Sequence, residues 1–154
     1  MIFMIQLLIL SKNIMKDSIE YKTILIVEDE VINIKIDRYA ISRYFVDINI
    51  LTATNLGDAA RVVNQNHIDA IILDTIFPEG ENNLIPLEYK VRPGILFLRH
   101  IRNLNELKNI PVLCTSRGID KVLISEINSL DASFIMRPYN VTEFVNILIE
   151  MLYR

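Results

Sequence analysis

The chain has 154 residues, of which 51% are hydrophobic and 23% charged, and its formal net charge at pH 7 is −3. This length corresponds to one domain that can bury a core without disulfides or a structural metal. The negative charge gives no general attraction to nucleic acid or to an anionic membrane. The single cysteine, Cys114, excludes an intramolecular disulfide and fits a reducing compartment, so we expect a cytoplasmic protein with Cys114 in its core.

The first ten residues are almost wholly apolar. Ten residues are too few to span a bilayer, and no basic segment or small-residue cleavage site marks a signal peptide. Three interpretations stay open: an added strand or helix, a weak contact with a membrane or a partner, or a translation start placed too early. We therefore divide the chain into an apolar extension, residues 1–21, and one domain, residues 22–154, with a long loop at about 78–93.

Regular alternation of strands and helices begins at residue 23. The first apolar run, residues 23–27, ends in the acidic sequence Glu-Asp-Glu at 28–30, and a helix is expected from there to about residue 45. Its core face is predicted from helical spacing and comprises Ile32, Ile36, Tyr39 and Ala40. A second stripe on the same helix is either buried too or a docking surface, and it comprises Ile34, Ile41 and Phe45.

Four further strands and four further helices follow in alternation. The strands are expected at residues 47–53, 69–74, 112–115 and 133–136. The helices are expected at residues 55–66, 94–103 with an extension to 109, 120–130 and 141–153, with Asn55 and Asn140 as caps of the first and last. Five alternating pairs predict an α/β fold with a doubly wound parallel sheet, and we expect the strand order 2-1-3-4-5.

Polar residues at the ends of these strands would meet at one edge of the sheet. Glu28 and Asp29 follow the first strand, Asp74 ends the third, Ser116 follows the fourth and Arg137 follows the fifth. Carboxylates this close repel one another unless a cation lies among them, and Mg²⁺ is the hard, oxygen-binding ion that fits best. Asp74 is therefore a candidate phosphoryl acceptor, with the metal, Arg137 and Ser116 placed to stabilise the transferred group.

The order and spacing of these motifs resemble the receiver domain of two-component response regulators, of the CheY-like single-domain type, a family with a flavodoxin-like fold. The resemblance covers the chain from about residue 22 to its end. The segments that carry it are residues 24–30, residues 69–74 with Pro78, Gly94, Ile101-Arg102, residues 111–116, and residues 134–139.

The resemblance implies that Asp74 accepts a phosphoryl group from a phosphohistidine on a sensor histidine kinase or a phosphotransfer protein. The implied Mg²⁺ ligands are Glu28, Asp29, Asp74 and the backbone carbonyl of Ile76. The implied switch residues are Ser116, whose hydroxyl would bind the phosphoryl group, and Phe134, which would turn inward behind it. Further implications are phosphodonor docking on the first helix and an output surface on the fourth helix, fifth strand and fifth helix.

Three features depart from the family pattern. Arg137 stands where the family has a lysine, and a planar guanidinium is not equivalent to a compact ammonium. Arg117 stands where a small residue normally leaves room for the phosphoryl group, so it either narrows access or adds a second cation. The interval from Asp74 to Gly94 is longer than the usual turn, which indicates either an insertion that alters donor access or a tolerated surface loop.

The chain ends directly after the last expected helix, which favours a stand-alone regulator that binds a downstream protein. We expect no enzymatic activity beyond Mg²⁺-dependent self-phosphorylation and slow self-dephosphorylation, no direct contact with nucleic acid and no membrane span. A homodimer through the last two helices and the fifth strand is possible, with Ile147 and Met151 as extra apolar residues of the last helix.

Three other functions share features with this sequence. The strongest alternative is a phosphorylation-independent pseudo-receiver that acts as a protein-binding module, since Arg117, Arg137 and the insertion crowd the site. A phosphatase of the haloacid dehalogenase type would need a second aspartate where Ile76 stands. An FMN-binding flavodoxin would place the flavin phosphate against the acidic residues 28–30, which would repel it.

Overall fold

The computed structural model of the chain describes residues 21–76, 92–118 and 121–153. Five parallel strands form one sheet in the order β2-β1-β3-β4-β5, which confirms the predicted fold class. The strands are β1 (Lys22–Val27), β2 (Ile48–Ala53), β3 (Ala70–Asp74), β4 (Val112–Ser116) and β5 (Ser133–Met136). The helices are α2 (Val31–Tyr44), α3 (Leu56–Gln65), α4 (Pro93–Arg102), α5 (Lys121–Ser129) and α6 (Val141–Tyr153).

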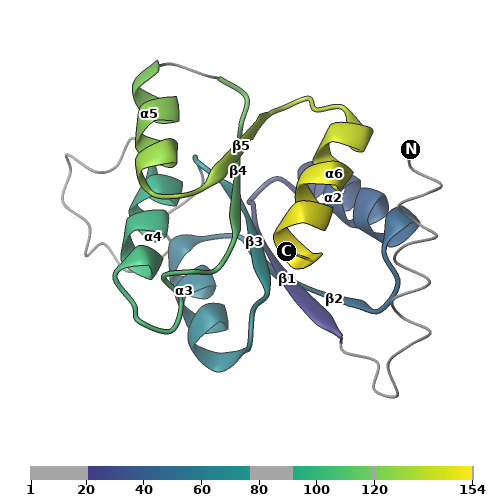
Figure 1. Cartoon of the computed structure of the whole chain (residues 1–154), viewed down its shortest axis with the longest axis horizontal. Coiled ribbons are helices and arrows are strands. Elements are labelled where there is room, and N and C mark those ends of the chain that lie inside the picture. The colour runs from purple at the N-terminus through teal and green to yellow at the C-terminus, as the bar shows by residue number, and fades with distance from the viewer. Residues whose placement is uncertain (1–20, 77–91, 119–120, 154) are drawn as a thin grey trace.

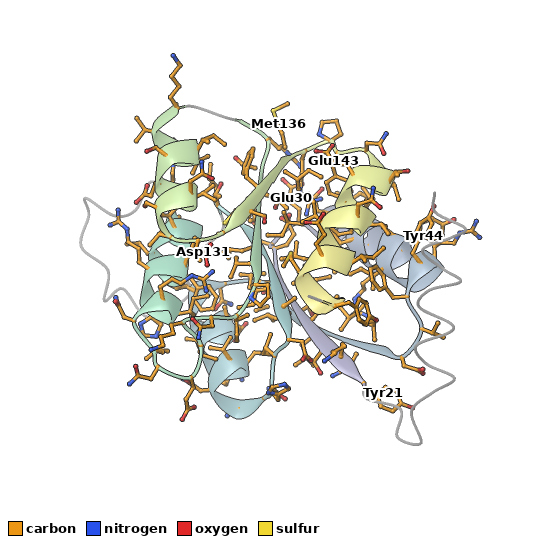
Figure 2. The ribbon with its side chains drawn as sticks, in the orientation of Figure 1. Tyr21, Glu30, Tyr44, Asp131, Met136 and Glu143 are labelled. Carbon is orange, nitrogen blue, oxygen red and sulfur yellow. The ribbon has the colours of Figure 1, made fainter. Side chains whose placement is uncertain are left out.

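The helices cover both faces of the sheet (Figure 1). One core lies between the sheet and α3, α4 and α5, and the other lies between the sheet and α2 and α6. A parallel strand buried on both faces needs apolar residues at successive positions, and the run Ala-Ile-Ile-Leu of β3 is fully buried. Because these strands all pair in parallel, the carboxyl ends of β1, β3, β4 and β5 lie at one edge of the sheet. In Figure 2, Met136 and Glu30 lie toward that edge, whereas Tyr21 lies at the opposite edge.

Helix α2 buries a different face from the predicted one. Ile32 and Tyr39 are 59% and 67% exposed, and Ile36 is exposed too, so only Ala40 of the predicted core face is buried. The buried residues of α2 are instead Asn33, Asp37, Ala40 and Ile41. The second stripe faces the core with Ile41 and, just after the helix, Phe45. The apolar spacing was misleading because two polar side chains occupy core-facing turns near the carboxyl edge of the sheet.

Glycine at position 94 allows α4 to begin directly against the end of β3. A Cβ atom there would lie 2.1 Å from the carbonyl oxygen of Asp74 and 2.7 Å from the Cα of Thr75. The Gly94 amide donates to the Thr75 carbonyl oxygen at 3.2 Å, which fixes this contact. The start of α4 therefore packs on the backbone that carries Asp74.

Other sequence predictions have mixed outcomes. Cys114 is buried, as expected, and Asn55 caps α3 by accepting from the Asp58 amide at 2.9 Å. The proposed extension of α4 to residue 109 is wrong, because the helix ends at Arg102. Met151 lies in the core, so it does not contribute to a surface patch on α6.

Two predicted regions, the apolar extension at 1–20 and most of the long loop at 78–93, lie outside the described residues. Among the residues that the structure does describe, no helix is long and apolar enough to cross a membrane. Those residues also leave Val122, Met136 and Val141 exposed on the side of α5, β5 and α6.

Candidate functional site

Three carboxylates meet at the carboxyl edge of the sheet, as the strand endings predicted. Oxygen atoms of Glu28, Asp29 and Asp74 all lie within 4.8 Å of one another. Glu28 is buried, Asp74 is partly buried and Asp29 is exposed. The cluster therefore has a closed inner side and one side open to solvent.

Burial and neighbouring negative charge raise the proton affinity of Glu28 and Asp74. Burial, followed by the charge of Glu28, raises the pKa of Asp74 to about 7. Burial also raises the pKa of Glu28, although the Glu30 amide and the charge of Arg137 act in the opposite direction. A divalent cation among oxygen ligands removes this repulsion, so the donor set fits Mg²⁺.

The N-terminal turn of α2 orients Glu28. One Glu28 oxygen accepts from the Glu30 amide at 3.1 Å, and the other accepts from the Asn33 side chain at 3.0 Å. Asn33 is one of the polar residues on the core-facing side of α2. The helix therefore fixes the innermost carboxylate of the cluster.

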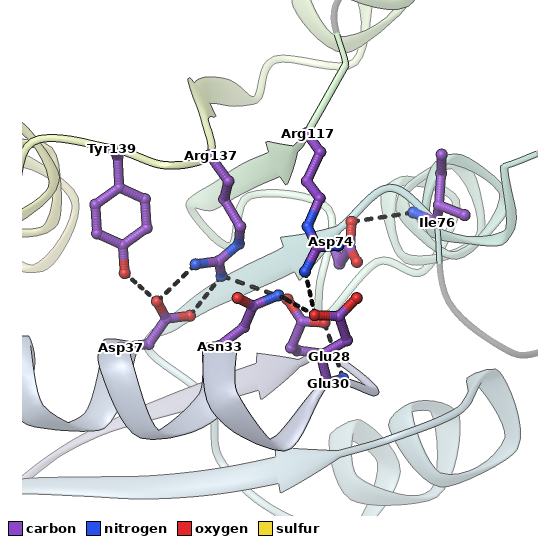
Figure 3. Close-up of polar contacts among 9 residues, drawn as sticks. All are labelled: Glu28, Glu30, Asn33, Asp37, Asp74, Ile76, Arg117, Arg137 and Tyr139. Carbon is purple, nitrogen blue, oxygen red and sulfur yellow. Dashed lines mark hydrogen bonds and ion pairs between the residues drawn. The ribbon is translucent and has the colours of Figure 1, made fainter.

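Arg137 approaches the site from the end of β5, but its guanidinium group pairs with α2 (Figure 3). Its Nη1 and Nη2 atoms donate to the two oxygens of Asp37 at 3.1 and 2.7 Å. Nη2 also lies 3.5 Å from Glu28 Oε2. Burial alone would lower the pKa of Arg137, but the hydrogen bonds and charge of Asp37 raise it above its usual value. In the described residues Arg137 forms no ion pair with Asp74.

Arg117 has a different partner. Its Nη2 atom donates to the Glu30 carboxylate, and both side chains are substantially exposed. The pair links the segment after β4 to the residue that precedes α2 (Figure 3). Arg117 therefore adds an exposed cation beside the N-terminus of α2, where Glu30 pairs with it.

The remaining predicted site residues lie on neighbouring segments. Ser116 is buried and directly follows Thr115, the register partner of Asp74 in β4. The Ile76 amide donates to Asp74 Oδ1 at 3.2 Å, which orients the acceptor carboxylate. Phe134 is partly buried and packs against the core on the α4 and α5 side of the sheet. The roles assigned to these residues remain predictions.

Sequence reasoning missed Asp37, Asn33 and Tyr139 as parts of this site. The Tyr139 hydroxyl donates to Asp37, and its ring stacks on Phe144 of α6 with the centroids 4.5 Å apart. The available signal was the spacing of Asn33 and Asp37, which are four residues apart and so share one face of a helix. Counting apolar residues alone concealed this polar face.

The strand order and the acidic edge define the class: the chain has the fold of response regulator receiver domains, as its motifs predicted. Solved structures with this fold include CheY4, a chemotaxis response regulator of Vibrio cholerae, at 18% identity and a TM-score of 0.70 over 86% of this chain and all of that one. A response regulator of Thermotoga maritima is 18% identical, with a TM-score of 0.69 over 88% of this chain and all of that one.

A third structure is the receiver domain of a sensor histidine kinase from Pseudomonas aeruginosa, solved with a magnesium ion in its active-site cleft. It is 16% identical, with a TM-score of 0.69 over 88% of this chain and all of that one. A curated protein from Porphyra purpurea, named "Probable transcriptional regulator ycf29", is 27% identical over 135 residues. The match covers 87% of this chain and 57% of that protein, so the chain spans little more than half of its relative. No family model matches the chain.

Proposed function

We propose that the chain is a phosphorylation-dependent receiver that accepts a phosphoryl group on Asp74. The observation that carries the proposal is the cluster of Glu28, Asp29 and Asp74 at the carboxyl edge of a sheet with the receiver strand order. The donor is a phosphohistidine on a sensor histidine kinase or a phosphotransfer protein. The output is a change of conformation that a downstream protein recognises.

In the transfer step an oxygen of Asp74 forms a bond to phosphorus while the phosphorus–nitrogen bond of the donor breaks. The donor imidazole leaves with that electron pair and takes up a proton from water. Glu28, Asp29, Asp74 and the carbonyl of Ile76 would hold Mg²⁺, which neutralises charge on the transferred oxygens. The Ile76 amide orients Asp74, and the Ser116 hydroxyl is the group proposed to bind the phosphoryl oxygens.

Helix α2 is the proposed docking face for the phosphodonor. Its exposed side carries Val31, Ile32, Ile36 and Tyr39, which lead directly away from the acidic edge. An apolar strip beside a reactive carboxylate suits contact with another protein. The proposed output surface lies on α5, β5 and α6, where Val122, Met136 and Val141 are exposed.

The pseudo-receiver remains the second candidate, because both arginines of the site have internal partners. Arg137 pairs with Asp37, and Arg117 pairs with Glu30. In that function the domain binds a protein without being phosphorylated. The two candidates differ in one measurable property, the chemistry of Asp74.

The test is intact-mass spectrometry of the full chain after incubation with acetyl phosphate, with and without Mg²⁺. We expect one phosphoryl adduct that requires Mg²⁺ and is absent from the Asp74→Ala variant. Asp58→Asn is a matched control, because Asp58 is an acid on α3 outside the cluster, and it should be labelled like wild type. If no adduct forms with acetyl phosphate, nor in an Arg117→Ala variant with a more open site, the receiver function is contradicted and the binding module is adopted.

A further inference from the structure

Asp37 is a fully buried carboxylate in the middle of α2, with 0% of its side chain exposed. It is not part of the cluster that would hold Mg²⁺. Its two oxygens accept from Nη1 and Nη2 of Arg137 at 3.1 and 2.7 Å, and Oδ1 also accepts from the Tyr139 hydroxyl. Paired bonds between a guanidinium and a carboxylate are among the strongest that two side chains form.

Arg137 is 7% exposed, and the N–H groups of its guanidinium do not all have partners in the part of the chain that the structure describes. Both terminal nitrogens face Asp37, and Nη2 also approaches Glu28 Oε2 at 3.5 Å. Its Nε has no hydrogen-bond partner among the described residues. The cation that the site would offer to a phosphoryl group is therefore already occupied by an anion from α2 (Figure 3).

Phosphorylation would place a second anion within reach of the same cation. A phosphoryl group carries roughly −1.5 to −2 charges at pH 7 and three acceptor oxygens, so it attracts a neighbouring guanidinium strongly. If Arg137 turned toward it, Asp37 would keep only the Tyr139 hydroxyl while remaining buried. An unpaired buried carboxylate is strongly unfavourable, so the two anions compete for one cation.

We propose that Asp37 is a positioning residue that competes with the phosphoryl group on Asp74 for Arg137. This inference rests on the proposed function and adds its regulation. In the unphosphorylated protein Arg137 pairs with Asp37. In the phosphorylated protein it turns away from Asp37 and binds the phosphoryl oxygens instead. The exchange removes the main partner of Asp37, and the Tyr139 ring, stacked on Phe144, connects this change to α6.

The competition predicts that removing the negative charge of Asp37 strengthens the binding of a phosphoryl analogue at Asp74. Beryllium fluoride with Mg²⁺ forms a non-covalent analogue of an acyl phosphate on a carboxylate, so its dissociation constant reports the phosphorylated state. Asp37→Asn keeps the size of the side chain and an oxygen for the Tyr139 hydroxyl but releases Arg137. We expect it to bind beryllium fluoride about tenfold more tightly than wild type, a moderate coupling between two sites.

Two controls separate this effect from simpler ones. Glu143→Gln removes an exposed negative charge from the first turn of α6 and leaves the Asp37–Arg137 pair intact. Tyr139→Phe removes the other hydrogen bond of Asp37 but keeps its charge and its pair with Arg137. Both should bind the analogue within about twofold of wild type. If either control binds beryllium fluoride as tightly as Asp37→Asn does, the effect arises from net charge or loosened packing. That result would overturn the proposal.

Arg137→Lys tests the same competition by changing the cation and not the carboxylate. It also replaces Asp37→Asn as the test if that variant does not fold. A lysine keeps the charge but cannot make two parallel bonds to Asp37, so it should also bind the analogue more tightly than wild type. Unchanged or weaker binding in the folded variants, with wild type labelled by acetyl phosphate, overturns this inference alone. Absence of both labelling and analogue binding in wild type and all variants overturns the proposed function, and this inference with it.

Discussion

The Asp74 carboxyl group lies where a negative charge is unfavourable in the metal-free protein. It is partly buried, and Glu28 and Asp29 are its nearest acidic neighbours. Its pKa is therefore about 7, compared with 3.8 for the unperturbed side chain. Because the folded state binds a proton that the unfolded state has released, this residue favours folding at low pH, and its contribution is lost as pH rises through about 7.

Replacing Asp74 by asparagine should therefore stabilise the metal-free protein at high pH. In the presence of EDTA at pH 8 we expect the free energy of unfolding to rise by about 1–3 kcal/mol, a value reduced for the partial exposure of the group. At pH 5 the gain should be much smaller, because wild-type Asp74 is then protonated in the folded state. Urea unfolding at both pH values measures the difference.

Asp58→Asn is the reference for this measurement, because Asp58 belongs to the first turn of α3 and lies outside the acidic cluster. Its effect on stability should not grow between pH 5 and pH 8. If Asp74→Asn raises the free energy of unfolding equally at the two pH values, burial and the charge of Glu28 do not disfavour ionised Asp74 as described.

At the scale of single elements, the start of α4 is the most constrained contact near the site. Gly94 packs on the backbone of Asp74 and Thr75, and any side chain at this position meets main-chain atoms that cannot move aside. We expect Gly94→Ala to lower the free energy of unfolding by about 1–3 kcal/mol because of this overpacking. Denaturant unfolding, followed by circular dichroism, checks the value.

Gly57→Ala is the matched control for that prediction. Gly57 lies in the first turn of α3, and a Cβ there would make only an ordinary contact, 3.4 Å from the Asn55 side-chain oxygen. Alanine also has the higher helix propensity, so this variant should be neutral or slightly stabilising. A loss of stability in Gly57→Ala as large as in Gly94→Ala would show that the close approach to β3 is not the cause.

The order of elements could be predicted because each carries its own local signal. The central strands β1, β3 and β4 are largely buried runs. Asn55 and Asn140 mark helix starts where their side chains accept from backbone amides. The burial of α2 could not be predicted in this way. Asp37 and Asn33 are buried through their partners Arg137 and Glu28, and these partnerships join residues that only the completed fold brings together.

In the site too, some features follow from the sequence and others depend on contacts that only the complete fold makes. The acidic cluster follows from strand order, since residues at the ends of adjacent parallel strands must meet. The direction of the Arg137 side chain does not follow, because it depends on competition between Asp37 and the acidic edge for one guanidinium. Sequence spacing placed Arg137 at the correct edge but could not indicate which anion holds it.

At the scale of the whole molecule, a metal that binds the acidic cluster stabilises the entire fold. Glu28 and Asp29 follow β1 and Asp74 ends β3, so the ligands are together only when the sheet is formed. A ligand that binds only the folded state adds about 2.7 kcal/mol at a hundred times its dissociation constant. We therefore expect the melting temperature to rise with the logarithm of Mg²⁺ concentration.

Differential scanning calorimetry tests this with NaCl at matched ionic strength and with Asp29→Asn. Salt alone should give a smaller shift that does not depend on Asp29. Asp29 is exposed, so its replacement should leave the metal-free fold intact while weakening the response to Mg²⁺. An undiminished Mg²⁺ response in Asp29→Asn would contradict its place among the metal ligands.

The hydrogen bond between Gly94 and Thr75 also has a consequence for engineering and for variation among relatives. It joins the two ends of the stretch between β3 and α4 at a separation of 3.2 Å. Because these ends are already fixed, lengthening the chain between them costs little loop-closure entropy, about 0.6 kcal/mol for each doubling of its length. The stretch between β3 and α4 is therefore a suitable place to insert a fluorescent reporter or an affinity tag next to Asp74 while keeping the domain folded.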